Sequence, residues 1–234
     1  MRISDSISRI VKAAIATLIS VVLCMAMVMP AGATDVADAE MLVDRARITF
    51  NEFMGDTQFA WFHENLKDTK GLLIYPQVIK GGFIFGGSGG TGVFVVRDEK
   101  TGDWSQPAFY SIGSATVGLQ IGGEASQIIV MVMSQKAVDS LLTSSFKFGG
   151  DTSVALGPIG FGAKQNIIAD FVSFAKSQGL YAGINLEGSI VNVRDSLNGA
   201  YYGKQVTPVD ILIRNEVSNK GSNELRAALK KAVK

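Results

Sequence analysis

The chain has 234 residues, of which 47% are hydrophobic and 18% charged, and its formal net charge is +1. This composition is typical of a folded protein and excludes a disordered polymer, and the length is sufficient for one well-packed domain. The charge is near zero and no run of Lys or Arg is longer than the pair at Lys230 and Lys231, so nothing here favours nucleic-acid binding.

The first 33 residues have the pattern of a secretory signal peptide. Three basic residues precede an uncharged run over residues 13–30, and Ala31, Gly32 and Ala33 form a small-residue cleavage site. We therefore expect cleavage after Ala33, export to the periplasm or cell envelope, and a single domain over residues 34–234. The alternative is an uncleaved anchor, since the apolar run approaches the length of a membrane span. Cys24, the sole cysteine, lies in this segment, so the mature chain would have no disulfide or thiol chemistry.

Two helices are predicted next. Apolar side chains recur at helical spacing over residues 35–54, and residues 57–66 form a second helix for which Asp56 is a suitable N-cap. The polar face of the first helix is largely acidic, unlike helices that bind anionic lipid, so we expect it to pack on its own domain. His63 in the second helix has no cysteine or second histidine with which to form a metal site.

The most informative stretch is rich in glycine. Residues 71–123 contain 13 of the 26 glycines, interleaved with Ile, Val and Phe, which indicates short strands with sharp bends. We interpret Gly81–Phe85 and Val93–Val96 as neighbouring strands joined by a loop over Gly86–Gly92. Amides of such a loop could bind an anion, and the alternative is a hairpin tip without a ligand. The candidate glycine-loop residues are Gly86, Gly87, Ser88, Gly89 and Gly90.

Two enzyme motifs match this loop without their required context. Residues 87–92 fit G-x-G-x-x-G and residues 86–90 fit G-x-S-x-G, but each motif needs a helix directly after it. The β-branched and aromatic run from Val93 predicts a strand instead. No paired carboxylates or calcium-loop pattern stand out, so we predict no catalytic residue, no metal and no cofactor.

The rest of the chain combines further strands with short helices. Strands are predicted to about residue 132, and then at 152–156, 167–175 and 179–184. Residues 189–193 either continue the sheet or open a helix. Helices are predicted at 134–142, 207–214 and 222–233. These elements predict an α+β fold, with a curved, mostly antiparallel sheet or barrel-like core flanked by N- and C-terminal helices.

Seven short motifs in order resemble the SYLF lipid-binding domain family. They are Gly71–Pro76 with Gly81–Phe83, Asp103–Pro107, Val117–Gly123, Gly157–Gly160, Ser177–Gly183, Leu186–Ser189, and Tyr202–Gly203. The resemblance covers roughly residues 35–215 and implies a membrane-associated binding module rather than an enzyme. Eukaryotic members resemble phosphoinositide-binding domains, some of which bind actin. This chain departs from them in its acidic first helix and in Phe161, where the family often has arginine.

The leading functional hypothesis is therefore binding of anionic phospholipid at a membrane surface, with phosphoinositide-like headgroups included. Cations beside apolar loop tips would make the contact, and the candidates are Lys80, Arg97, Lys164 and Lys176. Each of these could instead be a solvated charge at a sheet edge. The second hypothesis is a protein-interaction module of the cell envelope, scaffolding or actin-binding, without a lipid site.

Overall fold

The computed structural model describes residues 31–82, 85–117, 122–160, 166–177, 180–182 and 185–233. Lys164 and Phe161 lie outside these residues. The helical elements are α2 (Ala31–Met54), η1 (Thr57–Phe59), α3 (Ala60–Asn65), η2 (Leu66–Asp68), α4 (Gln135–Leu141), α5 (Asp195–Tyr202), α6 (Pro208–Leu212), η3 (Lys220–Ser222) and α7 (Asn223–Ala232). The strands are β1 (Gly71–Gly82), β2 (Phe85–Val96), β3 (Ala108–Val117), β4 (Gly122–Val132), β5 (Ser145–Lys147), β6 (Val154–Leu156), β7 (Phe171–Ser177), β8 (Leu180–Ala182) and β9 (Ile190–Val193).

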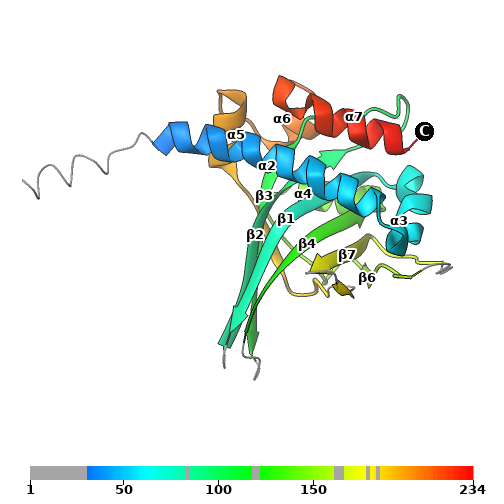
Figure 1. Cartoon of the computed structure of the whole chain (residues 1–234). Coiled ribbons are helices and arrows are strands. Elements are labelled where there is room, and N and C mark those ends of the chain that lie inside the picture. The colour runs from blue at the N-terminus through cyan, green and yellow to red at the C-terminus, as the bar shows by residue number, and fades with distance from the viewer. Residues whose placement is uncertain are drawn as a thin grey trace, which may run out of the picture.

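The described strands form one curled, mostly antiparallel sheet, which confirms the predicted α+β class (Figure 1). Their order is β5-β9-β3-β2-β1-β4-β7-β6, with β8 also paired to β7, and only β6 and β7 run parallel. The sheet curls until its two ends approach each other. Phe146 of β5 lies with its ring centroid 5.4 Å from that of Phe171 in β7, although these strands are far apart in the strand order. The sheet is therefore a half-barrel with an inner and an outer face.

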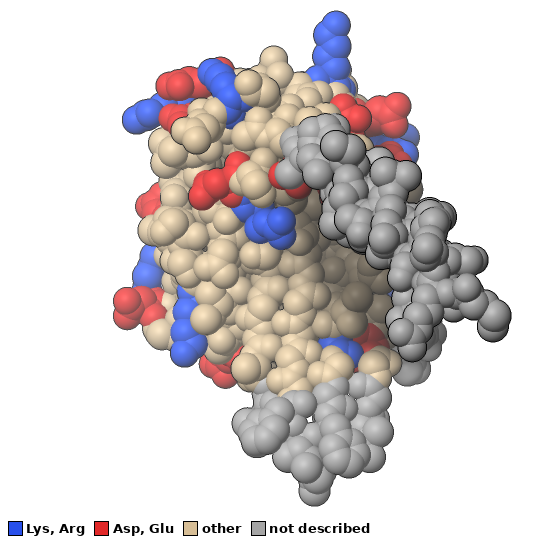
Figure 2. All heavy atoms as spheres, turned by 90° about the vertical axis from the view of Figure 1, so that its left-hand side faces the viewer, with Lys and Arg blue, Asp and Glu red and all other residues tan. Residues whose placement is uncertain are grey.

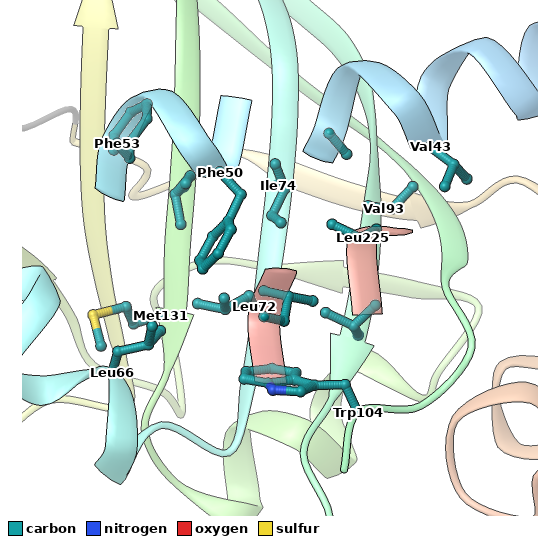
Figure 3. Close-up of a cluster of buried hydrophobic side chains, with 14 of the residues drawn as sticks. Val43, Phe50, Phe53, Leu66, Leu72, Ile74, Val93, Trp104, Met131 and Leu225 are labelled. Carbon is teal, nitrogen blue, oxygen red and sulfur yellow. The ribbon is translucent and has the colours of Figure 1, made fainter. Parts of the chain in front are cut away.

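Helices from both ends of the chain cover the outer face. In Figure 1 α2 lies across the upper half of the sheet, with α5 and α7 beside it. Alternate residues of the strands pack beneath these helices in the cluster drawn in Figure 3, because successive side chains of a strand point to opposite faces. This outer cluster includes Val43, Phe50, Phe53, Leu66, Leu72, Ile74, Val93, Trp104, Met131 and Leu225.

The inner face has its own apolar cluster. Its buried members come from the central strands, from both ends of the sheet, and from α4 and α6. They include Leu73, Tyr75, Phe94, Tyr110, Val130, Leu141, Phe148, Phe171, Val191 and Leu212. Strands that are apolar on both faces explain the near-continuous hydrophobic runs at Leu72–Tyr75 and Ile128–Val132.

The predicted glycine loop was wrong, because Gly86–Gly92 lie inside β2. This strand pairs along its length with β1 on one side and with β3 on the other. Pro76 interrupts β1 at a bulge, as expected for a residue without an amide donor. The structural reason for the glycines is close packing at two points: a Cβ at Gly92 would lie 2.5 Å from Cδ1 of Tyr75, and one at Gly90 would lie 2.9 Å from Cγ2 of Val78.

Helix predictions were mostly confirmed. The side chains of Asp56, Ser134 and Thr207 accept hydrogen bonds at the starts of η1, α4 and α6, as their cap positions predict. The helix α5 was not predicted. Residues 104–107 lie in the stretch predicted to be mostly strand up to about residue 132, but in the described structure they make one bridge, between Arg97 and Trp104. In the part of the chain that the structure describes, no helix has an apolar stretch that could cross a bilayer.

Candidate functional site

The structure does not bring the predicted cations into one site. Lys80 is exposed in β1, where its cross-strand partners are Ser88 and Glu124. Arg97 follows β2 at the other end of the sheet, opposite Lys70. Along β1, ten residues separate Lys80 from Lys70, which lies opposite Arg97, and this corresponds to a distance of about 30 Å. Of the four predicted cations, three lie in the described residues, and Lys176 alone of these lines the groove described below.

The glycine-rich segment cannot bind an anion in the way proposed for a loop. The residues Gly86–Gly90 are paired on both sides within the sheet, so their amides are not gathered in an open turn. The Ser88 hydroxyl lies 2.8 Å from the Ser114 hydroxyl, and Nε2 of His63 lies 2.8 Å from the carbonyl oxygen of Phe53. The serine of the G-x-S-x-G match and the histidine of α3 therefore have partners other than each other.

A groove of about 500 Å³ runs beside α2, where the helix passes over the bulge of β1. It is lined by Arg45, Ile48 and Thr49 of α2, Pro76 and Gln77 of β1, Ala125, Ser126 and Gln127 of β4, and Lys176 of β7. The bulge at Pro76 shifts the register of β1 against both neighbours, and a bulge bends its strand locally. Its volume is within the usual range of ligand sites.

The charges that line the groove are both positive. Arg45 and Lys176 are the cations, and no carboxylate is among the lining residues. Lys176 Nζ lies 3.1 Å from the Asp56 carboxylate, which offsets part of its charge. Among the described residues Arg45 makes no hydrogen bond or ion pair, whereas Arg47, two residues later, pairs with Asp44 at 2.7 Å and Glu224 at 3.3 Å. Arg45 is therefore the uncompensated cation of the groove.

Exposed apolar side chains border the same groove. Ile48 is 42% exposed, and Met41, two turns earlier on α2, is 46% exposed. Ile79 is 57% exposed and is the cross-strand partner of Ala125, which lines the groove. Figure 2 shows one face of the molecule, whose lower half is largely uncharged with charges at its margins. The groove therefore combines the uncompensated guanidinium of Arg45 with exposed apolar side chains at its border.

Sequence reasoning missed Arg45 and its apolar neighbours. Met41, Arg45 and Ile48 are spaced four and then three residues apart, so they share one side of a helix. The acidic residues dominated the assessment of this helix. Asp44 pairs with Arg47, whereas Glu52 accepts a hydrogen bond of 2.6 Å from Gln127, a residue that lines the groove, and so lies next to its edge.

The pKa values that are shifted in the folded chain have structural causes. Burial raises the pKa of Tyr75 and Tyr110 far above the usual range, and raises that of Tyr201 to about 12, so all three stay protonated at neutral pH. Hydrogen bonds from Thr207 hold the pKa of Asp210 below its usual value, as expected in a capping box. No group of metal-ligating side chains is found within the described ranges.

Comparison with known proteins identifies the family. The family model described as "Ysc84: Las17-binding protein actin regulator" matches residues 113–232, slightly more than half of the chain. Among curated proteins, the chain is similar to Protein YSC84 of Saccharomyces cerevisiae, with 36% identity over 154 residues that are 63% of this chain and 32% of that protein. It is also 35% identical to LAS seventeen-binding protein 3 of the same yeast, covering 63% of this chain and 33% of that protein.

A human relative extends the similarity to animals. SH3 domain-containing YSC84-like protein 1 is 34% identical over 148 residues, which are 61% of this chain and 43% of that protein. The chain thus spans about a third to two fifths of the length of these relatives. Motif order, the α+β half-barrel and these matches agree, and the chain belongs to the Ysc84 family of SYLF domains.

Proposed function

We propose that this chain is a non-enzymatic binding module that binds anionic phospholipid at a membrane surface through the groove beside α2. The observation that carries the proposal is the uncompensated Arg45 in a groove lined by two cations and no carboxylate. A phosphate of a lipid headgroup supplies the missing negative charge, and an inositol phosphate headgroup would do so as well. Ile48 and Met41 on the same side of α2 would contact the boundary between headgroups and acyl chains.

The expected affinity of the chain for an anionic membrane is modest. A Lys or Arg near an anionic membrane surface contributes about 1 kcal/mol, which is roughly a fivefold change in partitioning. Two cations with a few apolar contacts therefore predict reversible, salt-sensitive association. Screening at high ionic strength should weaken it, because the charges are exposed to solvent.

The test is co-sedimentation of the chain with phosphatidylglycerol vesicles and with phosphatidylcholine vesicles at low and high salt. We expect binding to the anionic vesicles only, and a loss of roughly fivefold in partitioning for Arg45→Gln. Arg47→Gln is the matched control, since Arg47 lies on the other flank of the same helix and pairs with Asp44 and Glu224. No sedimentation at low salt, or equal loss in both variants, would reject the groove as a lipid site.

A protein partner is the second candidate, favoured by the family description as a Las17-binding actin regulator. In this case the exposed apolar residues beside the groove would form part of a protein interface rather than meet lipid. Sedimentation with filamentous actin in the absence of lipid distinguishes the two. Binding to filaments that persists in Arg45→Gln, with no vesicle binding, would favour the protein-interaction module.

We also propose that the chain is exported, with residues 1–33 acting as a leader. The basis is the sequence pattern alone. N-terminal sequencing of the exported protein should begin at Thr34, and a chain that still begins at Met1 in the cytoplasmic fraction would contradict this.

A further inference from the structure

A second cavity, of about 680 Å³, lies at the end of the sheet opposite to the projecting strand ends. Three segments distant in sequence meet there: the turn after β2, the segment that follows α6, and α7. The lining includes Arg97, Lys100, Trp104, Ile213, Asn215 and Arg226.

The carboxylates that line this cavity all have partners within the described chain. Asp98 accepts hydrogen bonds from the amides of Lys100 at 2.8 Å and Thr101 at 3.0 Å. Glu99 pairs with Lys70, and Asp103 pairs with Lys230 at 2.5 Å. Lys230, and Arg226 at longer range, hold the pKa of Asp103 below its usual value, so this carboxylate stays charged and engaged.

The two arginines of the cavity are not paired with a carboxylate in this way. Arg226 Nε donates to the carbonyl of Trp104 at 2.8 Å, and Arg97 Nη1 donates to the carbonyl of Lys67. Arg97 and Trp104 are bridge partners, so the carbonyl that receives Arg226 belongs to the residue beside Arg97. Within the described ranges neither guanidinium lies within 4.0 Å of a carboxylate oxygen. Arg97 Nε is buried and has no acceptor, which is costly for a donor.

We propose that this cavity binds a small phosphate-bearing ligand between Arg97 and Arg226. Guanidinium groups form two parallel hydrogen bonds with phosphate oxygens, and they do so best where water is partly excluded. A phosphate here would accept from the Nη groups of Arg226, and the guanidinium of Arg97 would supply a second positive charge beside it. Arg97 Nε itself is closed off from the cavity, and the charge of Lys100 is partly offset by Asp98. The volume suits a small organic phosphate ester. The site is separate from the groove at Arg45 and does not depend on the function proposed for that groove.

The test is calorimetric titration of the chain with inorganic phosphate and with glycerol 3-phosphate. We expect saturable binding of both, at least tenfold weaker in Arg226→Gln and in Arg97→Gln, with an intermediate loss in Arg226→Lys, which keeps the charge but not the fork. Lys147→Gln is the control, since Lys147 is an exposed cation of β5 that lines neither cavity, and it should bind as the unmodified chain does. Thermal unfolding of each variant checks that a loss of binding is not a loss of folding.

Phosphatidic acid vesicles distinguish a lipid headgroup from a free phosphate ester. A tenfold loss of vesicle binding in Arg226→Gln would support the site with lipid as the source, and vesicle binding unchanged beside lost glycerol 3-phosphate binding would support a free ester. No binding of either soluble phosphate by the unmodified chain, or equal binding by Arg226→Gln and the control, would overturn the proposal. Neither of these results bears on the vesicle test of Arg45.

Discussion

Glycines in β1 and β2 differ in what their missing side chains permit. At Gly92 a Cβ would lie 2.3 Å from the carbonyl oxygen of Ile74, and at Gly90 one would lie 2.4 Å from that of Gln77. At Gly81 a Cβ would meet nothing within 4 Å. The first two glycines are therefore required by the close packing of adjacent strands around the bulge, whereas Gly81 is not required by packing.

This difference predicts effects of different size for the same substitution at the two positions. Gly92→Ala should lower the free energy of unfolding by about 1–3 kcal/mol, because backbone and the Tyr75 ring must both move. Gly81→Ala is the matched control in the neighbouring strand and should change it by about 0.5 kcal/mol or less. Urea unfolding followed by circular dichroism measures both. Equal destabilisation would show that glycine is needed for backbone freedom rather than for space.

Asp170 links the start of β7 to α4 and to the segment before β6. Its carboxylate accepts hydrogen bonds from the Ser134 hydroxyl and from the amide and hydroxyl of Ser153. The bond from Ser134, then that from the Ser153 amide, holds its pKa below the usual value. A lowered pKa in the folded state contributes stability above the unfolded value of about 3.9, and this is lost as pH falls through the folded pKa.

We therefore expect the chain to lose stability below about pH 4, in part through Asp170. In Asp170→Asn the urea midpoint should fall at pH 7 but change less between pH 7 and pH 3 than in the unmodified chain. Asp139→Asn is a control, since Asp139 is an exposed carboxylate of α4. An unchanged pH profile in Asp170→Asn would remove Asp170 from the acid transition.

At the scale of elements, α2 owes its position to one apolar side. Its buried residues Val43, Phe50 and Phe53 face the outer cluster (Figure 3), as does Ala46. The ring of Phe53 stacks on that of Phe59 at a centroid distance of 4.4 Å. Burial of such side chains, rather than helix propensity, holds a surface helix on a sheet. The groove at Arg45 exists because this packing fixes the other flank of the helix above β1 and β4.

Truncation of a buried side chain of α2 should therefore be severe. Phe50→Ala is expected to cost about 3–5 kcal/mol, because it leaves a cavity under the helix next to Phe62. Met41→Ala on the exposed side should cost about 0.5 kcal/mol or less and leave the fold intact. Thermal or urea unfolding of both variants tests this. A similar cost for both would mean that the side of α2 facing the sheet is wrongly assigned.

Local sequence signals predicted the capped helices, and also α7, which has no side-chain cap at its start, but they did not predict α5. Asp56, Ser134 and Thr207 mark helix starts within a few residues of themselves, so their role is readable along the chain. The helix α5 has no side-chain cap at its start. It is held instead by Asn198, whose side chain accepts a hydrogen bond of 2.9 Å from the Phe109 amide in β3. No local pattern reports such a distant partner.

At the scale of the whole molecule, the two ends of the chain meet over one face of the half-barrel. Arg47 of α2 contacts Glu224 of α7 at 3.3 Å, and Leu225 and Leu229 of α7 are buried in the same outer cluster as α2. The curl of the sheet then separates the two proposed sites. The groove is lined by α2, β1, β4 and β7, and the second cavity is lined by the turn after β2, the segment after α6 and α7. Figure 1 shows α7 at the end of the sheet away from the projecting ends of β1–β4.

The sequence by itself determined the α+β class, the flanking helices, the strand-rich middle and the family. The spacing of apolar residues, the helix caps and the order of the motifs can all be read along the chain. Only the tertiary structure decided that Gly86–Gly92 form a strand, since this depends on pairing with β1 and β3 on both sides. It also decided which cations share a cavity. Arg97 and Arg226 are more than a hundred residues apart, and Arg45 and Lys176 line one groove only because α2 packs across the sheet. Whether a charge is compensated depends on which side chains lie close to it in space, and the order of residues along the chain does not show this.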